Sequence, residues 1–464
     1  MKSGRIIIAA GASGSGKTLI TCGILKVLKN RRKSVASFKC GPDYIDPIFH
    51  STIIGTKSRN LDTFFTSPQI TRYLLKMNAA DADISVIEGV MGYYDGIGGV
   101  LIKASAYELA MVTETPVVLI VNCRGMSVSI LAYIQGFLKY KTDSGIKGVI
   151  LNQISSALYP KIKQKIEEEL KVTVYGYAPV VPDCVIESRH LGLKMPSEIS
   201  GFKEKLIKLS NILEKTLNID ALLDLANQAP ELNSNNPWRG EPSFNFRLPE
   251  EVTVAVARDE AFCFIYEDNI QLLEKMGAKI VYFSPLKDSK LPTGIHGLLL
   301  YGGYPELYGQ SLEGNISMRE SVLAGISNGL PVIAECGGFM YLHESHEDVH
   351  GNSYKMVGAI KGRAYDTKKL NRFGYIDVFQ NNDNVLGVKL PKLTAHEFHY
   401  FDSTVCRKDF TARKPQNGRS WDCICADENQ FIGFPHFYYY GNPQIPKAFL
   451  ERCCHYQRLP RSHK

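Results

Sequence analysis

The octapeptide GASGSGKT at residues 11–18 constrains this chain more than any other stretch. It follows the apolar run RIIIAA at 5–10, and a segment with apolar residues at helical spacing begins directly after it. A glycine-rich loop between a strand and a helix, ending in Gly-Lys-Thr, is the P-loop pattern. Its backbone N–H groups and the helix N-terminus bind phosphate, so the sequence predicts an α/β fold that binds a nucleoside triphosphate.

The residue types in this loop predict a division of tasks. Lys17 should reach the outer phosphates of ATP, and the Thr18 hydroxyl should ligate Mg²⁺. Asn152 ends another apolar run and could contact the base, although a strand-end Asn is more often a turn former. The predicted nucleotide-binding residues are Gly11, Ser13, Gly14, Ser15, Gly16, Lys17, Thr18 and Asn152.

Three carboxylates are candidates for the metal and the reacting phosphate. Glu88 ends the apolar run in VIEGVMGYYDG, where P-loop proteins hold a second Mg²⁺ ligand. The segment KCGPDYIDP at 39–47 places Asp43 and Asp46 in a turn stiffened by two prolines. We predict Thr18, Asp43 and Glu88 as metal ligands. The alternatives are a strand-terminal Glu and aspartates that cap a helix or close an Asx-turn.

The length and the order of apolar runs predict two α/β domains. A chain of 464 residues exceeds what one ordinary core buries. Continuous apolar runs alternate with helical spacing, as in a parallel sheet covered on both faces; the first set lies at 83–88, 116–122, 146–152 and 172–178. We expect a P-loop domain at 1–228, a Pro- and Asn-rich linker at 229–250, and a second α/β domain at 251–464.

Composition and charge limit the classes of molecule that this chain is expected to bind. The net charge of +7 is spread over mostly single Lys and Arg residues, which suits anionic small molecules and predicts no nucleic-acid surface. No apolar run reaches the eighteen or so residues that cross a bilayer, so we expect no membrane contact. Eleven scattered cysteines indicate reduced thiols and a cytoplasmic protein. The pairs Cys423/Cys425 and Cys453/Cys454 lack the spacing of a zinc site.

A second reactive site is predicted at Cys336. In GLPVIAECGGFMYL this cysteine follows a short apolar strand and precedes two glycines and a helical pattern, as in a nucleophile elbow. The helix N-terminus should lower the pKa of the thiol. Backbone amides of Gly302, Gly303 and Gly337 could form an oxyanion hole. A structural cysteine is the alternative.

A cysteine nucleophile needs a base, and three histidines are candidates. His436 follows an apolar β-type run, whereas His396 and His399 lie in AHEFHY at 395–400. The sequence leaves the choice open, because each histidine could instead be a satisfied structural residue.

Taken together, several motifs resemble one family along nearly the whole chain. They are GASGSGKT, FKCGPDYIDPIFH, SRNLD, EGVMGYYDG, RHLGL, GGYPELY, AECGGFMYL and HEFHY. The chain resembles the cobyrinate a,c-diamide synthase family of cobalamin biosynthesis. The resemblance implies an ATP-binding domain related to dethiobiotin synthetase, followed by a class I glutamine amidotransferase domain of the Cys–His type.

The resemblance also implies roles for individual residues. Cys336 would take the glutamine amide as a thioester, with His436 as the base. Asp43 and Asp46 would act near the phosphoryl intermediate and the substrate. Tyr438 stands two residues after the histidine, where such amidotransferases often carry a Glu.

The implied reaction amidates the a- and c-acetates of cobyrinate through an acyl phosphate, using ATP, Mg²⁺ and ammonia from L-glutamine. One alternative keeps this chemistry with a different tetrapyrrole, as in a nickel-sirohydrochlorin a,c-diamide synthase. Another is a non-catalytic P-loop module that senses nucleotide. The relation to dethiobiotin synthetase makes a homodimer possible.

Overall fold

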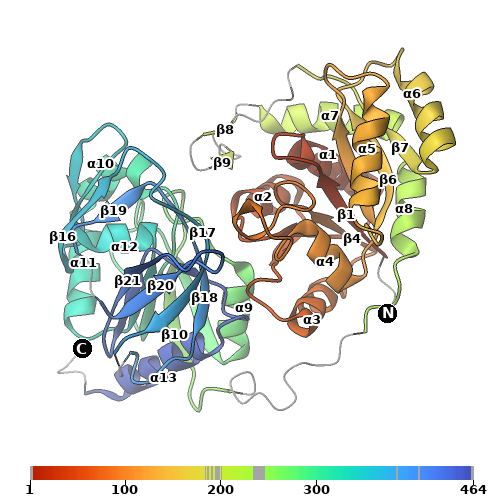
Figure 1. The fold of residues 1–464 in the computed structure, drawn as a ribbon. Helices are drawn as coiled ribbons and strands as arrows, with labels where there is room; N and C mark the ends of the chain where they lie inside the picture. The colour runs from red at the N-terminus through yellow and green to blue at the C-terminus, as the bar shows by residue number, and fades with distance from the viewer. Residues whose placement is uncertain are drawn as a thin grey trace. The chain divides into compact units, whose positions relative to one another are not determined.

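The computed structural model describes residues 4–182, 184, 188–189, 192–193, 199, 201–233, 246–382, 385–405 and 408–460. The chain divides into two compact units, unit 1 (Met1–Pro237) and unit 2 (Trp238–Lys464), which are drawn in Figure 1. Most of the linker predicted at 229–250 lies outside the described residues, as do His190 and Leu191 of the RHLGL motif. None of the helices in the described part of the chain is long and apolar enough to span a membrane.

Unit 1 is built on a seven-stranded parallel sheet. Except for the polar edge strand β3 (Lys57–Leu61), its strands are short, mainly apolar runs, and most of their residues are buried, as a parallel sheet between two helical layers requires. In spatial order they are β3, β2 (Val35–Cys40), β4 (Ile84–Glu88), β1 (Gly4–Ala10), β5 (Val117–Asn122), β6 (Ile146–Asn152) and β7 (Thr173–Ala178).

Helices connect these strands. The amphipathic helices α1 and α7 pack against each other, and α3 packs against α4 (Figure 1). The helices of unit 1 are α1 (Lys17–Asn30), α2 (Ile45–Ile48), α3 (Pro68–Asn78), α4 (Ala106–Thr113), α5 (Ser129–Tyr140), α6 (Tyr159–Lys165), α7 (Phe202–Thr216) and α8 (Ile219–Asn227). Shorter elements are η1 (Phe49–Ile53), η2 (Ile97–Gly99), η3 (Ile166–Leu170), β8 (Ser188–Arg189) and β9 (Gly192–Leu193).

The strand order places the loops of the first site together. From β1 the chain runs to β2 on one side of the sheet, and later from β4 to β5 on the other side, so the order reverses at β1. Ligands of open α/β sheets bind where the order reverses, beyond the carboxyl ends of the strands. The P-loop follows β1, and the neighbouring strands β4 and β2 end at Glu88 and Cys40.

Unit 2 contains a ten-stranded mixed sheet and a separate four-stranded sheet. The ten-stranded sheet is parallel from β11 to β22 and antiparallel beyond. In spatial order its strands are β11 (Ala278–Phe283), β10 (Val252–Ala257), β12 (Gly297–Leu300), β13 (Val332–Glu335), β22 (Gln430–Gly433), β21 (Ser420–Ala426), β20 (Phe410–Arg413), β17 (Arg372–Gln380), β18 (Leu393–His399) and β23 (His436–Phe437). The smaller sheet contains β15 (Ser353–Lys355), β14 (His343–Glu347), β16 (Ile360–Asp366) and β19 (Phe401–Ser403).

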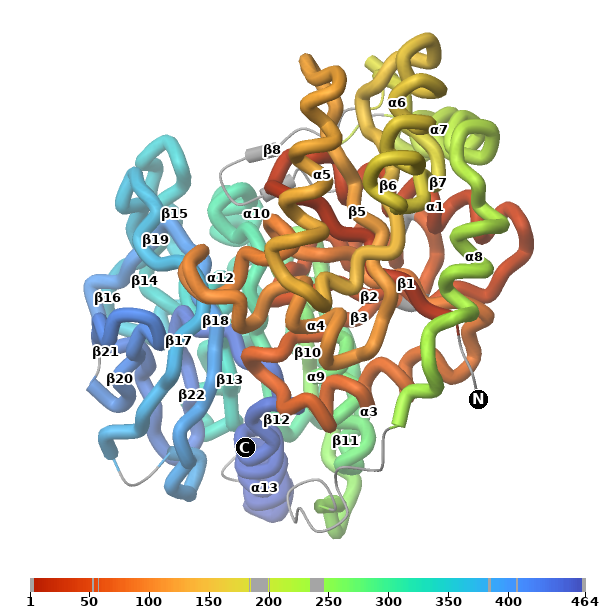
Figure 2. Tube along the Cα trace, turned by 45° about the vertical axis from the view of Figure 1, so that its right-hand side comes forward, coloured from red at the N-terminus to blue at the C-terminus, as the bar shows by residue number. Residues whose placement is uncertain are grey.

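Helices of unit 2 pack against the parallel strands of its larger sheet. Helix α13 packs beside β10 and β12, and Figure 2 shows it below these strands. The helices are α9 (Glu267–Lys275), η5 (Pro305–Leu307), α10 (Gly309–Gly314), α11 (Ile316–Ser327), α12 (Gly337–Leu342) and α13 (Gln444–Arg458). Cys336 belongs to the apolar core that α12 shares with β12 and β13. The prediction of an α/β fold with a parallel sheet in the first half and a second α/β region after it is confirmed.

Candidate functional site

The P-loop has the backbone shape that its glycines predict. Gly16 is left-handed, with φ 89°, at the N-cap of α1. A Cβ atom there would lie 2.5 Å from Asn152 Nδ2, so only glycine fits. The same amide nitrogen donates a hydrogen bond to the Ser15 carbonyl oxygen at 2.9 Å. Asn152 therefore braces the loop backbone, and its predicted contact with the base stays a prediction.

Lys17 is held by backbone oxygens. Its Nζ donates to the carbonyls of Ala12 at 3.1 Å and Met91 at 2.6 Å. Burial, followed by the charge of Lys39, lowers the pKa of Lys17 to about 8. A phosphate oxygen would be a stronger acceptor than either carbonyl, because it carries negative charge opposite the lysine ammonium. Lys17 is thus poised beside the loop for an anionic ligand.

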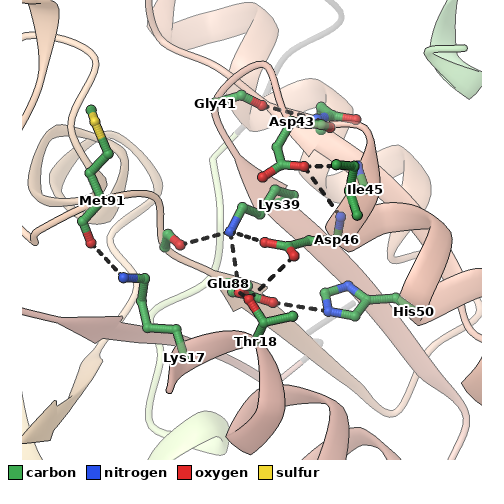
Figure 3. Close-up of polar contacts among 12 residues, drawn as sticks. Lys17, Thr18, Lys39, Gly41, Asp43, Ile45, Asp46, His50, Glu88 and Met91 are labelled. Atoms are coloured by element: carbon green, nitrogen blue, oxygen red, sulfur yellow. Dashed lines mark hydrogen bonds and ion pairs between the residues drawn. The ribbon is translucent and has the colours of Figure 1, made fainter. Parts of the chain in front are cut away.

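Three of the predicted side chains meet at the end of the P-loop (Figure 3). The hydroxyl of Thr18 lies 2.7 Å from Glu88 Oε1 and 3.2 Å from Asp46 Oδ1. Lys39 lies between the two carboxylates: its Nζ pairs with Asp46 Oδ2, lies 3.2 Å from Glu88 Oε1, and donates to the Gly89 carbonyl at 3.0 Å. Buried charges of opposite sign are therefore packed against the P-loop.

The charged groups in this cluster shift one another's pKa values. Burial alone would raise the pKa of Glu88, but Lys39, His50 and Thr18 outweigh it and hold this pKa below its usual range. Burial would likewise lower the pKa of Lys39, and the two carboxylates raise it instead. The pKa of Asp46 is raised by burial and by the neighbouring acids Asp43 and Glu88. Glu88 and Lys39 are thus a charged pair at neutral pH.

These residues fit a magnesium ion. Thr18, Asp46 and Glu88 offer hydroxyl and carboxylate oxygens, which Mg²⁺ prefers. Among the described residues, no group of three His, Cys, Asp or Glu side chains is arranged as a metal site. Mg²⁺ needs no such cage, because it takes most of its ligands from water and phosphate.

Asp43 has a different role in the geometry. Its Oδ1 accepts hydrogen bonds from the backbone N–H groups of Ile45 at 2.8 Å and Asp46 at 3.2 Å. Asn60, from the SRNLD motif, donates to the carbonyls of Gly41 and Asp43 and braces the same turn. With this oxygen Asp43 closes the turn that presents Asp46, and its predicted part in metal binding and catalysis stays a prediction.

Cys336 has the strained backbone of a nucleophile elbow. It links β13 to α12 with φ 48° and ψ −105°, which is unusual for a residue other than glycine. Its N–H donates to the Gly433 carbonyl at 2.8 Å, which fixes the turn against β22. The expected lowering of the thiol pKa is not found, because burial and the nearby Glu306 raise it and outweigh the Gly337 N–H. A base must therefore remove this proton when the thiol reacts.

His436 is the histidine beside Cys336. A Cβ atom on Gly302 would lie 2.6 Å from His436 Cε1 and 3.4 Å from Cys336 Cβ, so the ring and the cysteine both border this glycine. Gly303 is adjacent: its amide nitrogen lies 3.2 Å from the position of a Cβ on Gly337. The predicted base, nucleophile and oxyanion-hole glycines therefore share one neighbourhood.

The two other histidines are held elsewhere. His396 pairs with His436 across β18 and β23, and burial lowers its pKa well below the usual value. His399 donates from Nδ1 to the Phe401 carbonyl at 2.7 Å and stacks on Phe434, and burial lowers its pKa to about 3. His436 is thus the candidate with a described approach to Cys336.

Both units match known protein families. Residues 6–191 match the CobQ/CobB/MinD/ParA nucleotide binding domain, and residues 253–436 match the CobB/CobQ-like glutamine amidotransferase domain. A protein of Caldanaerobacter subterraneus subsp. tengcongensis named cobyrinate a,c-diamide synthase is 37% identical over 98% of this chain and 99% of its own. Proteins of the same name from Priestia megaterium and Clostridium tetani are 36% and 38% identical over 98% and 97% of this chain, and 98% and 100% of their own.

The chain belongs to the cobyrinate a,c-diamide synthase family. The resemblance drawn from the motifs is thereby confirmed. Members of this family are amidating ligases that use glutamine, so this chain is such a ligase. Its nucleotide-binding domain lies in unit 1 and its glutamine amidotransferase domain in unit 2.

Sequence reasoning missed two members of the first site in this cobyrinate a,c-diamide synthase family protein. Lys39 is buried between Asp46 and Glu88, and His50 places Nε2 3.0 Å from Glu88 Oε2 with both side chains fully buried. The available signal was a lysine near the end of the apolar strand VASFKC. A buried Lys is rare unless it is paired, so its position asked for carboxylate partners.

Proposed function

We propose that the protein amidates the a- and c-acetate side chains of cobyrinate, a step of cobalamin biosynthesis, with ATP and with ammonia released from L-glutamine. The curated relatives that match its whole length carry the name of this activity. The observation that carries the proposal is that Cys336 and His436 border the same glycine, in a chain whose P-loop is surrounded by carboxylates and lysines.

Unit 2 would supply the nitrogen. Cys336 attacks the side-chain amide carbon of glutamine, and His436 takes the thiol proton and passes it to the leaving nitrogen. Ammonia leaves, and a glutamyl thioester stays on Cys336 until water hydrolyses it to glutamate. The amides of Gly303 and Gly337 would stabilise the oxyanion that forms on the carbonyl.

Unit 1 would prepare the acceptor. A carboxylate does not react with ammonia at neutral pH, so the γ-phosphoryl group of ATP is transferred to an acetate oxygen, giving an acyl phosphate and ADP. Lys17 binds the outer phosphates, while Lys39 holds Asp46 and Glu88 in place and keeps Glu88 ionised. Mg²⁺, held by Thr18 and Glu88, would neutralise the developing charge. Ammonia then displaces phosphate and forms the amide, once at each acetate.

Replacing the thiol tests this division. Cys336→Ala should abolish amide synthesis with glutamine, whereas high ammonium chloride at pH 8 to 9 should still support it at wild-type rates. A matched control is Cys425→Ala, which removes another buried thiol of unit 2 and should retain glutamine use. Failure of ammonia to support synthesis in folded Cys336→Ala protein would contradict the proposal.

Substrate identity is tested by mass. Purified protein with ATP and glutamine should convert cobyrinate to a diamide, in which NH₂ replaces OH on two of its carboxyl groups. Incubation with nickel-sirohydrochlorin in parallel tests the alternative tetrapyrrole, and faster turnover of that compound would replace cobyrinate in the proposal. No glutamine-dependent ATP turnover with either compound would favour the nucleotide-sensing alternative.

We place the reaction in the cytoplasm, because all ten described cysteines are free thiols, as a reducing compartment maintains them. A homodimer is part of the proposal, and gel filtration at several protein concentrations tests it.

A further inference from the structure

The residue two positions after His436 does not supply a carboxylate. Tyr438 is fully buried there, and its hydroxyl donates to Asp268 Oδ2 on α9 at 2.8 Å. Its ring packs edge-on against Tyr266. A histidine that must act as a base needs a partner for its second ring nitrogen, because that partner fixes the tautomer.

Glu335 lies at that second nitrogen. Its Oε2 is 3.5 Å from His436 Nδ1, and both side chains are almost completely buried. Its other oxygen accepts a hydrogen bond from the backbone N–H of Phe437 at 3.4 Å. The strand that holds Glu335 is labelled β13 in Figure 2. Such contacts are often long in resting sites and shorten when the imidazole becomes charged.

The elbow explains how neighbours in sequence reach one imidazole. Side chains of consecutive strand residues point to opposite faces of a sheet. Glu335 is the last residue of β13, and at Cys336 the backbone turns to a φ of 48°, so this alternation ends between them. The carboxylate reaches His436 Nδ1, and the carbon that bears the thiol borders the same ring across Gly302.

We propose that Glu335 is the positioning residue of the glutaminase site. It accepts the Nδ1–H of His436, leaves Nε2 unprotonated to take the thiol proton, and stabilises the imidazolium that results. The inference rests on the proposed role of Cys336 and His436.

Other groups near His436 are engaged differently. His396 faces it from β18, and it is neutral because burial lowers its pKa far below the usual value. Glu397, the next residue of β18, accepts from Trp421 Nε1 at 3.5 Å. An ionised carboxylate is costly to bury without a partner. Among the described contacts, His436 and the Phe437 N–H are the partners of Glu335.

Glu335→Gln tests the inference with little change in shape. The amide oxygen can still accept from Phe437, but the negative charge at Nδ1 is lost. We expect kcat for glutamine hydrolysis to fall about 100-fold or more, with KM for glutamine unchanged within about threefold, because the ring orientation and not substrate binding is affected. Alkylation of Cys336 by a glutamine-analogue diazoketone should slow in parallel. Synthesis from ammonium chloride should stay within about twofold of wild type.

Two further variants complete the test. Tyr438→Phe is the control at the position after the histidine, and it should leave kcat unchanged within about threefold. Glu335→Asp keeps the charge at shorter reach and should be at least about tenfold more active than Glu335→Gln; if only the Asp variant folds, a loss of about tenfold in kcat at unchanged KM supports the role.

Three results would overturn the inference: glutaminase kcat within threefold of wild type in folded Glu335→Gln (or in Glu335→Asp, if only that variant folds), a loss confined to KM, or an equal loss of ammonia-dependent synthesis. These results differ from failure of the proposed function, which would appear as glutamine use by Cys336→Ala.

Discussion

Lys39 is the residue whose removal tests the first site most directly. Its side chain is 4% exposed and lies between Asp46 and Glu88, which are 6% and 0% exposed. Lys39→Met keeps most of the side-chain volume and removes the cation. Two buried carboxylates then lie close together without the cation between them, and leaving one member of a buried ion pair unpartnered costs about 3–5 kcal/mol. For a unit of this size that corresponds to a fall of about 10 °C in the unfolding midpoint.

The pH dependence has a defined sign. Without Lys39 the folded-state pKa of Glu88 rises above its unfolded value and the pKa of Asp46, which is already raised, rises further, so the folded variant binds more protons than the unfolded chain. The loss of folding stability of Lys39→Met relative to wild type should be largest above pH 7 and should shrink as the pH falls toward 5. In wild type Glu88 contributes in the opposite sense, because its depressed pKa stabilises the fold at pH values above the unfolded-state pKa and this contribution is lost in acid.

Calorimetry between pH 5 and 8 measures both the loss of stability and its pH dependence. Trp421 lies on β21 of unit 2, so its fluorescence reports whether that unit is unchanged. Lys165→Met, which removes an exposed pair with Glu169, is the matched control and should leave the midpoint unaltered. A deficit below about 1 kcal/mol, or one that does not vary with pH, would refute the charge cluster as the stabilising feature.

Other perturbations give sharp outcomes. Gly302→Ala should abolish glutamine hydrolysis and spare ammonia-dependent synthesis, since its methyl group would collide with His436; wild-type hydrolysis would show that the ring moves aside freely. ATP affinity, measured by calorimetry from pH 6.5 to 9.5, should weaken above about pH 8 as free Lys17 loses its proton, and a flat profile would contradict the lowered pKa. Asp43→Asn keeps the oxygen that caps the turn. A loss of synthesis with intact glutaminase activity would therefore assign a role to the charge of Asp43, whereas unchanged synthesis would limit its role to closing the turn. Asn152→Ala should weaken ATP binding about fivefold, the worth of one net hydrogen bond, by freeing the Ser15 carbonyl, and unchanged affinity would show that the loop holds its shape unaided.

The parallel sheets were predictable because their signals are local. Buried strands are continuous apolar runs, and the phosphate loop must lie between a strand and a helix. The antiparallel strands β17, β20 and β21 were not predicted, since many of their residues are only partly buried and their pairing joins distant segments. The residues of both sites were predicted mostly from motifs. The predicted lowering of the Cys336 pKa was wrong, because a helix N-terminus can be read from local sequence, whereas burial depends on the whole fold.

The sequence by itself determined the phosphate loop, the elbow at Cys336 and the family, because each is written in consecutive residues whose backbone demands only certain amino acids. Only the tertiary structure decided which side chains contact one another in each site. Lys39 meets Glu88 across 49 positions of sequence, and Glu335 meets the Phe437 backbone across 102. Such contacts depend on which strands become neighbours and where each one ends, and that is a property of the folded sheet, not of any segment in it.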